Sequence, residues 1–358
     1  MKKATRIASV LLTIFLLSVA YLLFWPVEID PVPWTPPVPP ALDGAFAANN
    51  ALDDIERLLP GYGAGPEDIA KSIHGQLYIG YEDGRIVCAN PDGSNPETFA
   101  NTGGRPLGMA WDIDDNLIVA DAHKGLLSIN PHGAVRVLST EEGSIPFGFT
   151  DDVDVAQDGT IYFTDASWKF HAPNYMADLM EHRGNGRFLS YDPKTGKTTK
   201  LIGDLCFANG VAISKDQSFV LINETWKYRV LRYWLTGEKK GTWDVFVDNL
   251  PGFPDNLSTS PDGGFWVAIA NQRDPLADGM LPYPILRKML WRLPKAFIPA
   301  IKRYGMVIKL DASGNVVQTL QSPSGVYAPI TSVNEYDGAL YFGSIVEDAV
   351  GKLVLKAQ

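Results

Sequence analysis

The sequence predicts an all-β fold, a six-bladed β-propeller, with an N-terminal transmembrane helix and a partly helical insertion late in the chain. Three observations point to it. A short turn-and-strand pattern recurs six times, the length of 358 residues suits one large domain or two ordinary ones, and a long apolar segment opens the chain. With 46% hydrophobic and 20% charged residues, the composition is that of a folded globular protein.

The charge balance indicates which partners the protein can take. Forty-one acidic and 31 basic residues give a formal charge of −10, which disfavours nucleic acid because phosphate binding needs a basic surface. The acidic excess suits cations instead. Cys88 and Cys206 are the two cysteines, too few for a disulfide framework and not spaced as a CxxC zinc motif.

Residues 1–27 have the features of a cytoplasmic stub followed by a transmembrane signal anchor. The 21 residues from 7 to 27 carry no charged side chain, and as a helix they span about 30 Å, the thickness of a hydrocarbon core. Lys2, Lys3 and Arg6 precede them. The positive-inside rule therefore predicts a cytoplasmic N-terminus. The folded body would then lie on the other side of the membrane, which is the periplasmic (extracytoplasmic) or the lumenal side. A cleaved signal peptide is the alternative interpretation.

Residues 28–59 form the predicted proline-rich spacer and lead-in to the folded body. Seven of the fifteen residues from Pro26 to Pro40 are proline. This composition favours an extended polyproline segment rising about 3 Å per residue.

The repeat joins a turn to three or four β-branched or aromatic residues, followed by a small or acidic residue. Short strands separated by turns indicate antiparallel β structure, and a four-stranded blade needs about 40 to 50 residues. Six units then fill residues 60–358. An irregular β-sandwich is the alternative, but it gives no reason for six copies of one signal. The copies start at Gly75, Asp115, Asp158, Asp216, Asp262 and Asp337.

Two longer gaps between copies mark insertions, at residues 168–186 and 274–304. The first is polar and loop-like. The second places Leu286, Leu290 and Leu293 at helical spacing with basic residues between them. Such a basic amphipathic stretch predicts contact with lipid headgroups or a lid over the propeller mouth, and packing on a blade edge is the alternative.

Oxygen-bearing side chains precede the blade strands in four places, in the fragments GlyProGluAsp, ThrAspAspValAsp, PheAlaAsnGly and ProGlyPheProAspAsn. Equivalent positions of a closed ring converge on its axis. Carboxylates crowded there repel each other unless a cation joins them, and a set of carboxylate and amide oxygens suits Ca²⁺. The predicted metal ligands are Glu67, Asp151, Asn209, Asp255 and Asn256.

These fragments resemble the strictosidine-synthase-like and adipocyte plasma membrane-associated protein family. GlyArgProLeuGly at 104–108, AspGlyThrIleTyrPheThrAsp at 158–165 and ArgTyrTrpLeu at 232–235 add to the resemblance, which covers residues 60–356 and the single N-terminal anchor. The family is similar in turn to the gluconolactonase and regucalcin group and to paraoxonases, which are calcium-dependent hydrolases of lactones and aryl esters.

The resemblance implies the same five calcium ligands, with Asp151 at a position where relatives usually carry asparagine. The extra carboxylate should tighten cation binding. A second, structural calcium would use Asp68 and Asp152. The histidine dyad of paraoxonases has no match, because Leu107 stands at the first position and His123 is only near the second.

The leading hypothesis is a membrane-anchored, calcium-dependent hydrolase of small-molecule esters or lactones. Calcium would stabilise the oxyanion as water attacks, with Asp255, or Glu67, as the base. No GxSxG motif occurs, which argues against a serine nucleophile on an elbow. The predicted substrate pocket consists of Leu107, Trp111, Phe149, Trp168 and Phe207.

Two other functions stay open. One is a non-catalytic propeller that calcium stabilises and that binds a ligand or protein at the membrane. The other is the condensation of an amine with an aldehyde, as in strictosidine synthase. It is disfavoured because Thr331 stands where the resemblance places the acid/base glutamate.

Overall fold

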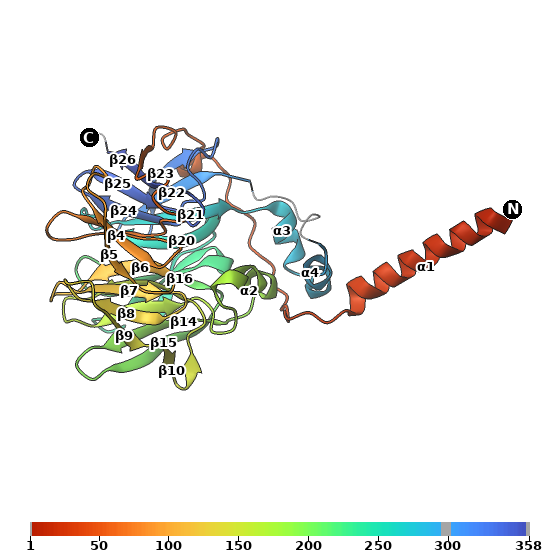
Figure 1. Cartoon of the computed structure of the whole chain (residues 1–358), viewed down its shortest axis with the longest axis horizontal. Coiled ribbons are helices and arrows are strands. Elements are labelled where there is room, and N and C mark those ends of the chain that lie inside the picture. Colours follow the sequence, from red (N-terminus) through yellow and green to blue (C-terminus); the bar gives the residue numbers. More distant parts are fainter. Residues whose placement is uncertain (1, 295–301, 356–358) are drawn as a thin grey trace.

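A computed structural model describes residues 2–294 and 302–355 and shows the six-bladed β-propeller expected from the repeats (Figure 1). Each blade is a four-stranded antiparallel sheet. The first strands of successive blades contact one another around the ring, so they line the central channel. The fold prediction is confirmed.

The strands run in chain order from the first strand of each blade outward. Blade 1 contains β2 (Ile69–Lys71), β3 (Leu77–Gly80), β4 (Arg85–Ala89) and β5 (Glu97–Asn101). Blade 2 contains β6 (Pro106–Trp111), β7 (Leu117–Asp121), β8 (Gly125–Ile129) and β9 (Val135–Ser139). Blade 3 contains β12 (Thr150–Val155), β13 (Ile161–Asp165), β14 (Gly186–Asp192) and β15 (Lys197–Leu205).

The remaining blades complete the ring. Blade 4 contains β16 (Ala208–Ile213), β17 (Phe219–Glu224), β18 (Arg229–Trp234) and β19 (Trp243–Val247). Blade 5 contains β20 (Gly252–Thr259), β21 (Phe265–Gln272), β22 (Gly305–Leu310) and β23 (Val316–Ser322). Blade 6 contains β24 (Ser332–Tyr336), β25 (Ala339–Gly343) and β26 (Val350–Val354). A small hairpin, β10 (Glu141–Glu142) and β11 (Ile145–Pro146), lies between blades 2 and 3.

The six sequence repeats correspond to the turn before the second strand, and that strand itself, in each blade: β3, β7, β13, β17, β21 and β25. The turn needs a residue in the left-handed region, which glycine adopts without a steric penalty and which aspartate tolerates. Gly75 (φ 87°), Asp115 (φ 58°) and Gly263 (φ 90°) fill this role. The backbone demand of the turn explains why the pattern is visible in the sequence.

The N-terminal strand closes the ring. β1 (Glu56–Leu58) pairs antiparallel with β26 and supplies the fourth, outermost strand of blade 6. The propeller therefore begins at Glu56, four residues before the boundary expected at residue 60. Closure by strand pairing joins the two ends of the folded body and covers the outer edge of β26.

The hydrophobic core is a ring of clusters, each shared by two neighbouring blades. Ile86 of blade 1 packs with Val119 of blade 2, and Leu221 of blade 4 packs in a cluster with Val267 and Ile308 of blade 5. Burying one such side chain contributes about 1.5–3 kcal/mol. Because every cluster joins two sheets, each blade depends on both of its neighbours.

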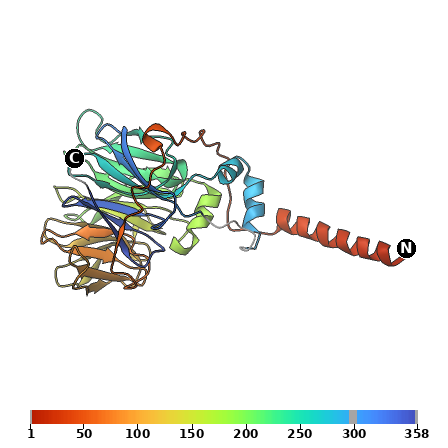
Figure 2. The same ribbon diagram turned by 90° about the horizontal axis from the view of Figure 1, so that it is seen from above.

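α2, α3 and α4 gather at one end of the propeller, and α1 projects away from that end (Figures 1 and 2). The insertion at 168–186 is partly helical rather than a loop, since Ala177 and the apolar side chain of Met180 pack in a buried cluster there. Residues 295–301 of the later insertion lie outside the described residues. The helices are α1 (Lys2–Phe24), η1 (Gly44–Phe46), η2 (Ala172–Asn174), α2 (Tyr175–Glu181), η3 (Thr225–Lys227), α3 (Pro275–Met280) and α4 (Pro284–Trp291).

Residues 25–40, here called the strap, are docked on this end of the propeller. The backbone N–H of Val32 donates to the carbonyl of Glu181 (3.1 Å), and that of Trp34 donates to Leu281 (3.2 Å). Trp34 stacks on the imidazole of His182, with ring centroids 4.5 Å apart. The proline-rich segment is therefore extended, as its composition predicts, but it is held by the folded body along its length.

A buried ion pair anchors the segment that enters β12. The carboxylate of Asp165, at the end of β13, accepts hydrogen bonds from the backbone N–H groups of Gly148 (3.1 Å) and Phe149 (2.9 Å). Its other oxygen lies 2.6 Å from the guanidinium of Arg187, and both side chains are nearly inaccessible. Asp165 thus fixes the backbone that leads into the channel-lining strand.

We expect Asp165→Ala to lower the free energy of unfolding by about 3–5 kcal/mol, because it leaves the buried guanidinium of Arg187 uncompensated. The measurement is urea denaturation. The exposed Asp348, which pairs with Arg57, is the matched control, and Asp348→Ala should cost about 1 kcal/mol or less. Equal effects of the two substitutions would contradict this assignment.

Stability should also fall in mild acid because of His182. Burial, reinforced by Lys227 and Arg287, lowers the pKa of His182 to about 2, from an ordinary value of 6.5. The folded state keeps the imidazole neutral, while the unfolded chain binds a proton. The contribution of His182 to the free energy of unfolding is therefore full above pH 6.5 and declines below it. The decline is at most about 1.4 kcal/mol per pH unit.

The substitution His182→Asn tests this pH dependence. Asparagine tolerates the left-handed conformation of this residue (φ 54°) and does not titrate. Unfolding free energies measured between pH 7 and pH 5 should decline less steeply in the variant than in the natural protein. Parallel pH profiles would show that His182 does not titrate on unfolding.

Candidate functional site

The strand pairing of each blade identifies one residue near the start of its first strand that has the same place in all six blades. In each blade it lies two residues before a register pair with the second strand, such as Val153 with Phe163 or Val211 with Ile222. This ring of equivalent positions contains most of the predicted ligands. Its members are Glu67, Leu107, Asp151, Asn209, Asp255 and Thr331.

A β-bulge interrupts the ladder at this position in blades 2 to 5. In blade 5 the register shifts between Pro254 and Leu257, the two residues that flank Asp255 and Asn256. A bulge lets consecutive residues depart from the usual alternation of sides along a strand. It explains how two neighbours in the sequence can serve one site.

The predicted ligands are brought together at the channel axis. The side-chain amide of Asn209 donates to Asp255 Oδ1 (2.7 Å), and that of Asn256 donates to Glu67 Oε1 (3.0 Å). The carboxylates of Asp151 and Asp255 both act electrostatically on Glu67, which places Asp151 in the same cluster. Residues nearly 190 positions apart in the chain are in hydrogen-bonding contact here.

The cluster contains buried oxygens without hydrogen-bond partners. Glu67 Oε2, Asn209 Oδ1 and Asn256 Oδ1 are inaccessible and accept no hydrogen bond among the described residues. An unsatisfied buried polar group costs about 1–3 kcal/mol, so three together need an explanation. A divalent cation coordinated by oxygen would supply the missing partner.

The donor set fits calcium better than zinc. Carboxylate and amide oxygens are hard ligands, and calcium accepts six to eight of them in flexible geometry. Within residues 2–294 and 302–355 no group of three or more His, Cys, Asp or Glu side chains is arranged to hold a metal. The candidate site depends on combining three carboxylates with asparagine amides.

Burial and mutual repulsion shift the acid equilibria of the cluster. Burial raises the pKa of Glu67 well above its ordinary value, and Asp68, Asp255 and Asp151 add to the effect. Burial, with Asp255 next in importance, raises the pKa of Asp151 in the same way. Asp255 is only half-buried, yet its position inside the protein raises its pKa to about 7. Protons or a cation must offset this negative charge.

Neighbouring blades position the ligand residues through their backbone carbonyls. Thr164 Oγ1 donates to the carbonyl of Asn209 (2.7 Å), Asn223 Nδ2 donates to that of Asp255, and Ser332 Oγ donates to that of Glu67 (2.8 Å). Each donor belongs to the blade before the ligand it holds. The six-bladed ring thus sets the spacing of the site directly.

Asn223 is the residue that sequence reasoning missed. It is fully buried in β17, and its Oδ1 atom is a fourth oxygen without a partner near the cluster. It follows no turn and lies in no ligand-like fragment. Its position one residue after Ile222, equivalent to Thr164 in blade 3, is recognisable only when the blades are compared in register.

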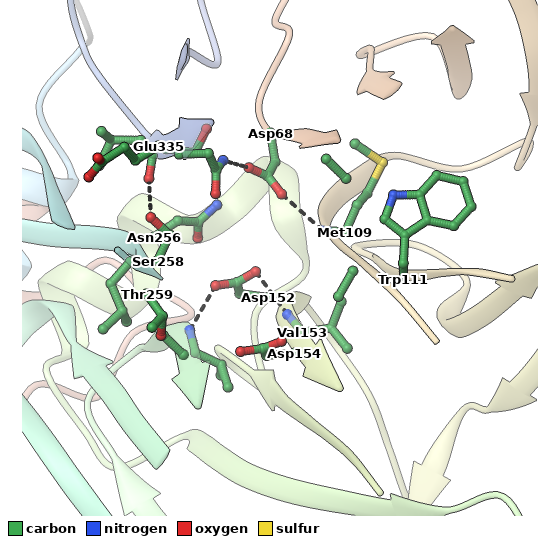
Figure 3. Close-up of a pocket in the computed structure, with 18 of the residues that line it drawn as sticks. Asp68, Met109, Trp111, Asp152, Val153, Asp154, Asn256, Ser258, Thr259 and Glu335 are labelled. Carbon is green, nitrogen blue, oxygen red and sulfur yellow. Dashed lines mark hydrogen bonds between the residues drawn. The ribbon is translucent and has the colours of Figure 1, made fainter. Parts of the chain in front are cut away.

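Asp68 and Asp152, predicted as a second metal site, have other partners. The oxygens of Asp68 accept from the N–H of Met109 (3.0 Å) and the amide of Asn334 (2.8 Å). Those of Asp152 accept from the N–H groups of Val153 (2.8 Å) and Val211 (2.7 Å), as Figure 3 shows. Each of the four oxygens accepts one hydrogen bond within or between blades, and a second calcium at Asp68 and Asp152 stays a prediction.

A cavity of about 250 Å³, whose lining residues Figure 3 shows, lies further along the first strands than the ligand cluster. It shares Asn256 with the cluster and is lined by Asp68, Asp152, Asp154 and Trp111. Trp111 is at the end of β6 opposite to Leu107, so it cannot line the mouth with the other predicted pocket residues. Trp111 lines this cavity and lies apart from the other predicted pocket residues.

Aromatic side chains form a wall beside the ligand cluster. Phe149, Phe207 and Phe253 each precede a ligand by two residues, in blades 3, 4 and 5. The rings of Phe149 and Phe207 meet edge to face at 5.5 Å, and Trp226 lies 4.5 Å from Phe207 and 5.6 Å from Phe253. Tyr175 of α2 packs against this group of aromatic side chains.

The other two predicted pocket residues occupy different surroundings. Leu107 is buried and is the apolar member of the ring of equivalent positions. Trp168 is 45% exposed on the first insertion and is not part of the aromatic wall. Phe149 and Phe207 are therefore the predicted pocket residues that the structure brings together beside the cluster.

Comparisons of the sequence with known proteins agree with this architecture. Residues 151–238 match the strictosidine synthase family, and residues 44–88 match the N-terminal region of strictosidine synthase-like proteins. The human adipocyte plasma membrane-associated protein is 37% identical, over 98% of this chain and 89% of its own. Strictosidine synthase-like protein 10 of Arabidopsis thaliana is also 37% identical, over 80% of this chain and 84% of its own.

Solved structures share the fold at low sequence identity. A gluconolactonase from Xanthomonas campestris superposes with a TM-score of 0.61 at 16% identity, covering 92% of this chain and 99% of its own. A calcium-binding protein, regucalcin, from Agrobacterium tumefaciens gives 0.57 at 15% identity, covering 86% and 94%. The chain belongs to the strictosidine synthase-like family of six-bladed propellers, together with the adipocyte plasma membrane-associated proteins.

Proposed function

We propose that the protein is a membrane-anchored, calcium-dependent hydrolase of esters or lactones. The observation that carries the proposal is the set of buried, unpartnered oxygens on Glu67, Asn209 and Asn256, beside the carboxylates of Asp151 and Asp255. A bound calcium ion would polarise the substrate carbonyl and stabilise the negative charge that develops on its oxygen.

Two carboxylates of the cluster are candidates for the general base that activates water. Asp255 is the half-buried carboxylate, and Asn209 holds its Oδ1 atom. Its other oxygen, Oδ2, accepts none of the described hydrogen bonds, and we assign it to take the proton of the attacking water. Glu67 is held through Oε1 by Asn256 and is the second candidate for this role.

The aromatic wall supports a substrate with an apolar group. Phe149, Phe207 and Phe253 stand on one side of the cluster, with Trp226 behind two of them. Such a surface binds an acyl or aryl group by burial and excludes water from that side of the carbonyl.

Two solved structures and one relative support the chemistry and the location at the level of their descriptions. The Xanthomonas neighbour is a gluconolactonase and the Agrobacterium neighbour a calcium-binding protein. The name of the human relative places it at the plasma membrane. In this chain, residues 3–24 form one helix long and apolar enough to cross a bilayer, and we propose the topology with the N-terminus in the cytoplasm.

Amine–aldehyde condensation is not supported by the site. Thr331 occupies the ring position in blade 6, and its hydroxyl donates to the carbonyl of Glu67 (3.3 Å). A threonine tied to the backbone offers no acid/base group for that reaction.

We expect the full-length protein in detergent to hydrolyse phenyl acetate or members of a lactone panel, and chelation of calcium to abolish the activity. Asp255→Asn should lower kcat by about 10²–10⁴, since it removes the base. Asp348→Asn, at an exposed position, is the control. The full chain is needed because a fragment beginning near residue 41 would lose Trp34 and the strap contacts.

Two outcomes of these assays would replace the hydrolase. A melting temperature that falls on chelation, without turnover of any substrate, would identify a non-catalytic propeller that calcium stabilises. A condensation product from tryptamine and an aldehyde would identify the strictosidine-type reaction.

Thr164→Val should weaken calcium binding about 10- to 100-fold, because valine keeps the shape of the side chain and loses the hydrogen bond that positions Asn209. Calorimetric titration of the purified protein with calcium measures the change. Thr198→Val is the matched control, since Thr198, on the outer strand of blade 3, shares a hydrogen bond with Ser139 of blade 2. Equal affinities of the two variants would refute the positioning role.

A further inference from the structure

The helices of the later insertion show an inverted distribution of side chains. In α4, Arg287 is buried, whereas Ile285 is 66% and Leu286 is 45% exposed. Tyr283, at the N-cap of α4, and Leu276 of α3 are exposed as well. A helix in water normally turns its apolar side chains inward and its charges outward.

The buried arginines have internal partners that explain their position. The guanidinium of Arg287 donates to the carbonyls of Val32 and Met180, so it joins the strap to α2. Arg292 donates to the carbonyls of Leu22 (2.7 Å) and Trp25 (2.6 Å) at the end of α1. Both guanidinium groups are hydrogen-bonded inside the protein and are not available to lipid headgroups.

The exposed apolar side chains lie beside the membrane helix. α4 contacts α1, and both views show α3 and α4 between the propeller and α1 (Figures 1 and 2). Along α1, Leu11, Phe15 and Leu17 are each more than half exposed, as expected of a helix that lipid surrounds. The apolar face of α3 and α4 continues this surface at the point where α1 meets the strap.

The charge distribution decides between two kinds of lipid contact. Lys288, the remaining basic residue of α4, lies 3.2 Å from the carboxylate of Asp30, and Arg183 pairs with the same aspartate. An electrostatic contact with anionic headgroups would need unpaired cations. Four exposed apolar side chains favour shallow insertion into the hydrocarbon boundary instead.

We propose that Leu276, Tyr283, Ile285 and Leu286 form a second membrane contact that inserts into the bilayer beside α1. The inference rests on the anchoring role proposed above for α1. The contact turns the helical end of the propeller, where the ligand cluster and the aromatic wall open, toward the membrane. The substrate is accordingly an ester or lactone that partitions into lipid, and it reaches the site from the bilayer.

The experiment places an environment-sensitive fluorophore on the full chain in phosphatidylcholine vesicles. Ile285→Cys is labelled in a background of Cys88→Ser and Cys206→Ala, and Ile113→Cys is the matched control. Ile113 is also an exposed isoleucine, in the turn between β6 and β7 at the opposite end of the propeller. We expect doxyl lipids to quench the label at 285 and iodide to quench the label at 113.

The same measurement separates the proposal from its alternatives. Quenching at 285 should persist in high salt and should not require phosphatidylserine. Loss of quenching in salt, or dependence on phosphatidylserine, would overturn the apolar contact in favour of a headgroup contact. Equal iodide quenching at 285 and 113, in protein that resists alkaline extraction from the vesicles, would show that the insertion is free in water.

Activity measurements on two substrates separate the proposed membrane contact from the proposed hydrolase function. The pair Ile285→Glu and Leu286→Glu should lower hydrolysis of an ester dissolved in the vesicles and leave hydrolysis of water-soluble phenyl acetate in detergent unchanged. If no substrate is hydrolysed, the hydrolase fails, while the quenching result still decides the membrane contact. An equal loss on both substrates would overturn the role of this surface in substrate access.

Discussion

The crowding of three carboxylates, two of them buried and one half-buried, at the axis of the propeller is the constraint on which the rest of the structure depends. Glu67, Asp151 and Asp255 come from blades 1, 3 and 5, and burial raises the pKa of each. Like charges in a low-dielectric interior are costly unless a counter-charge joins them. The asparagine oxygens left without partners beside them would suit the cation with several oxygen ligands that we propose.

Hydrogen bonds between neighbouring blades fix the positions of the ligand residues. Thr164 and Asn223 fix the carbonyls of ligand residues in the following blade, and Ser332 of the last blade fixes that of Glu67 in the first. The last contact crosses the seam that β1 and β26 close. The last blade is therefore joined to the first both at the axis, through Ser332 and Glu67, and through the N-terminal strand at its outer edge.

The same end of the propeller carries the site, the inserted helices and the strap. Arg287 and Arg292 join the strap and the end of α1 to α2 and α4 through backbone carbonyls. Buried guanidinium groups with several acceptors make rigid connections, because their planar donors have fixed directions. The orientation of the site relative to α1 is thus built into the packing rather than left to a flexible linker.

The sequence by itself determined the blade count and the short antiparallel strands, and it predicted the candidate oxygen ligands that the ring brings together. These follow from local rules: left-handed turn residues such as Gly75 and Asp115 mark each second strand, and short fragments carry Asp151 or Asn209 just after an aromatic residue. Each of these signals lies within about ten residues of chain, so no knowledge of the fold is needed to read it.

Only the tertiary structure decided the roles that depend on partners far away in the chain. It showed that Asn223 reaches the next blade, that Asp68 and Asp152 already have backbone donors, and that Arg287 points inward. A hydrogen bond depends on distance and direction between two groups, and the sequence states only that both groups exist. Packing brings such groups together, and packing is set by the whole ring.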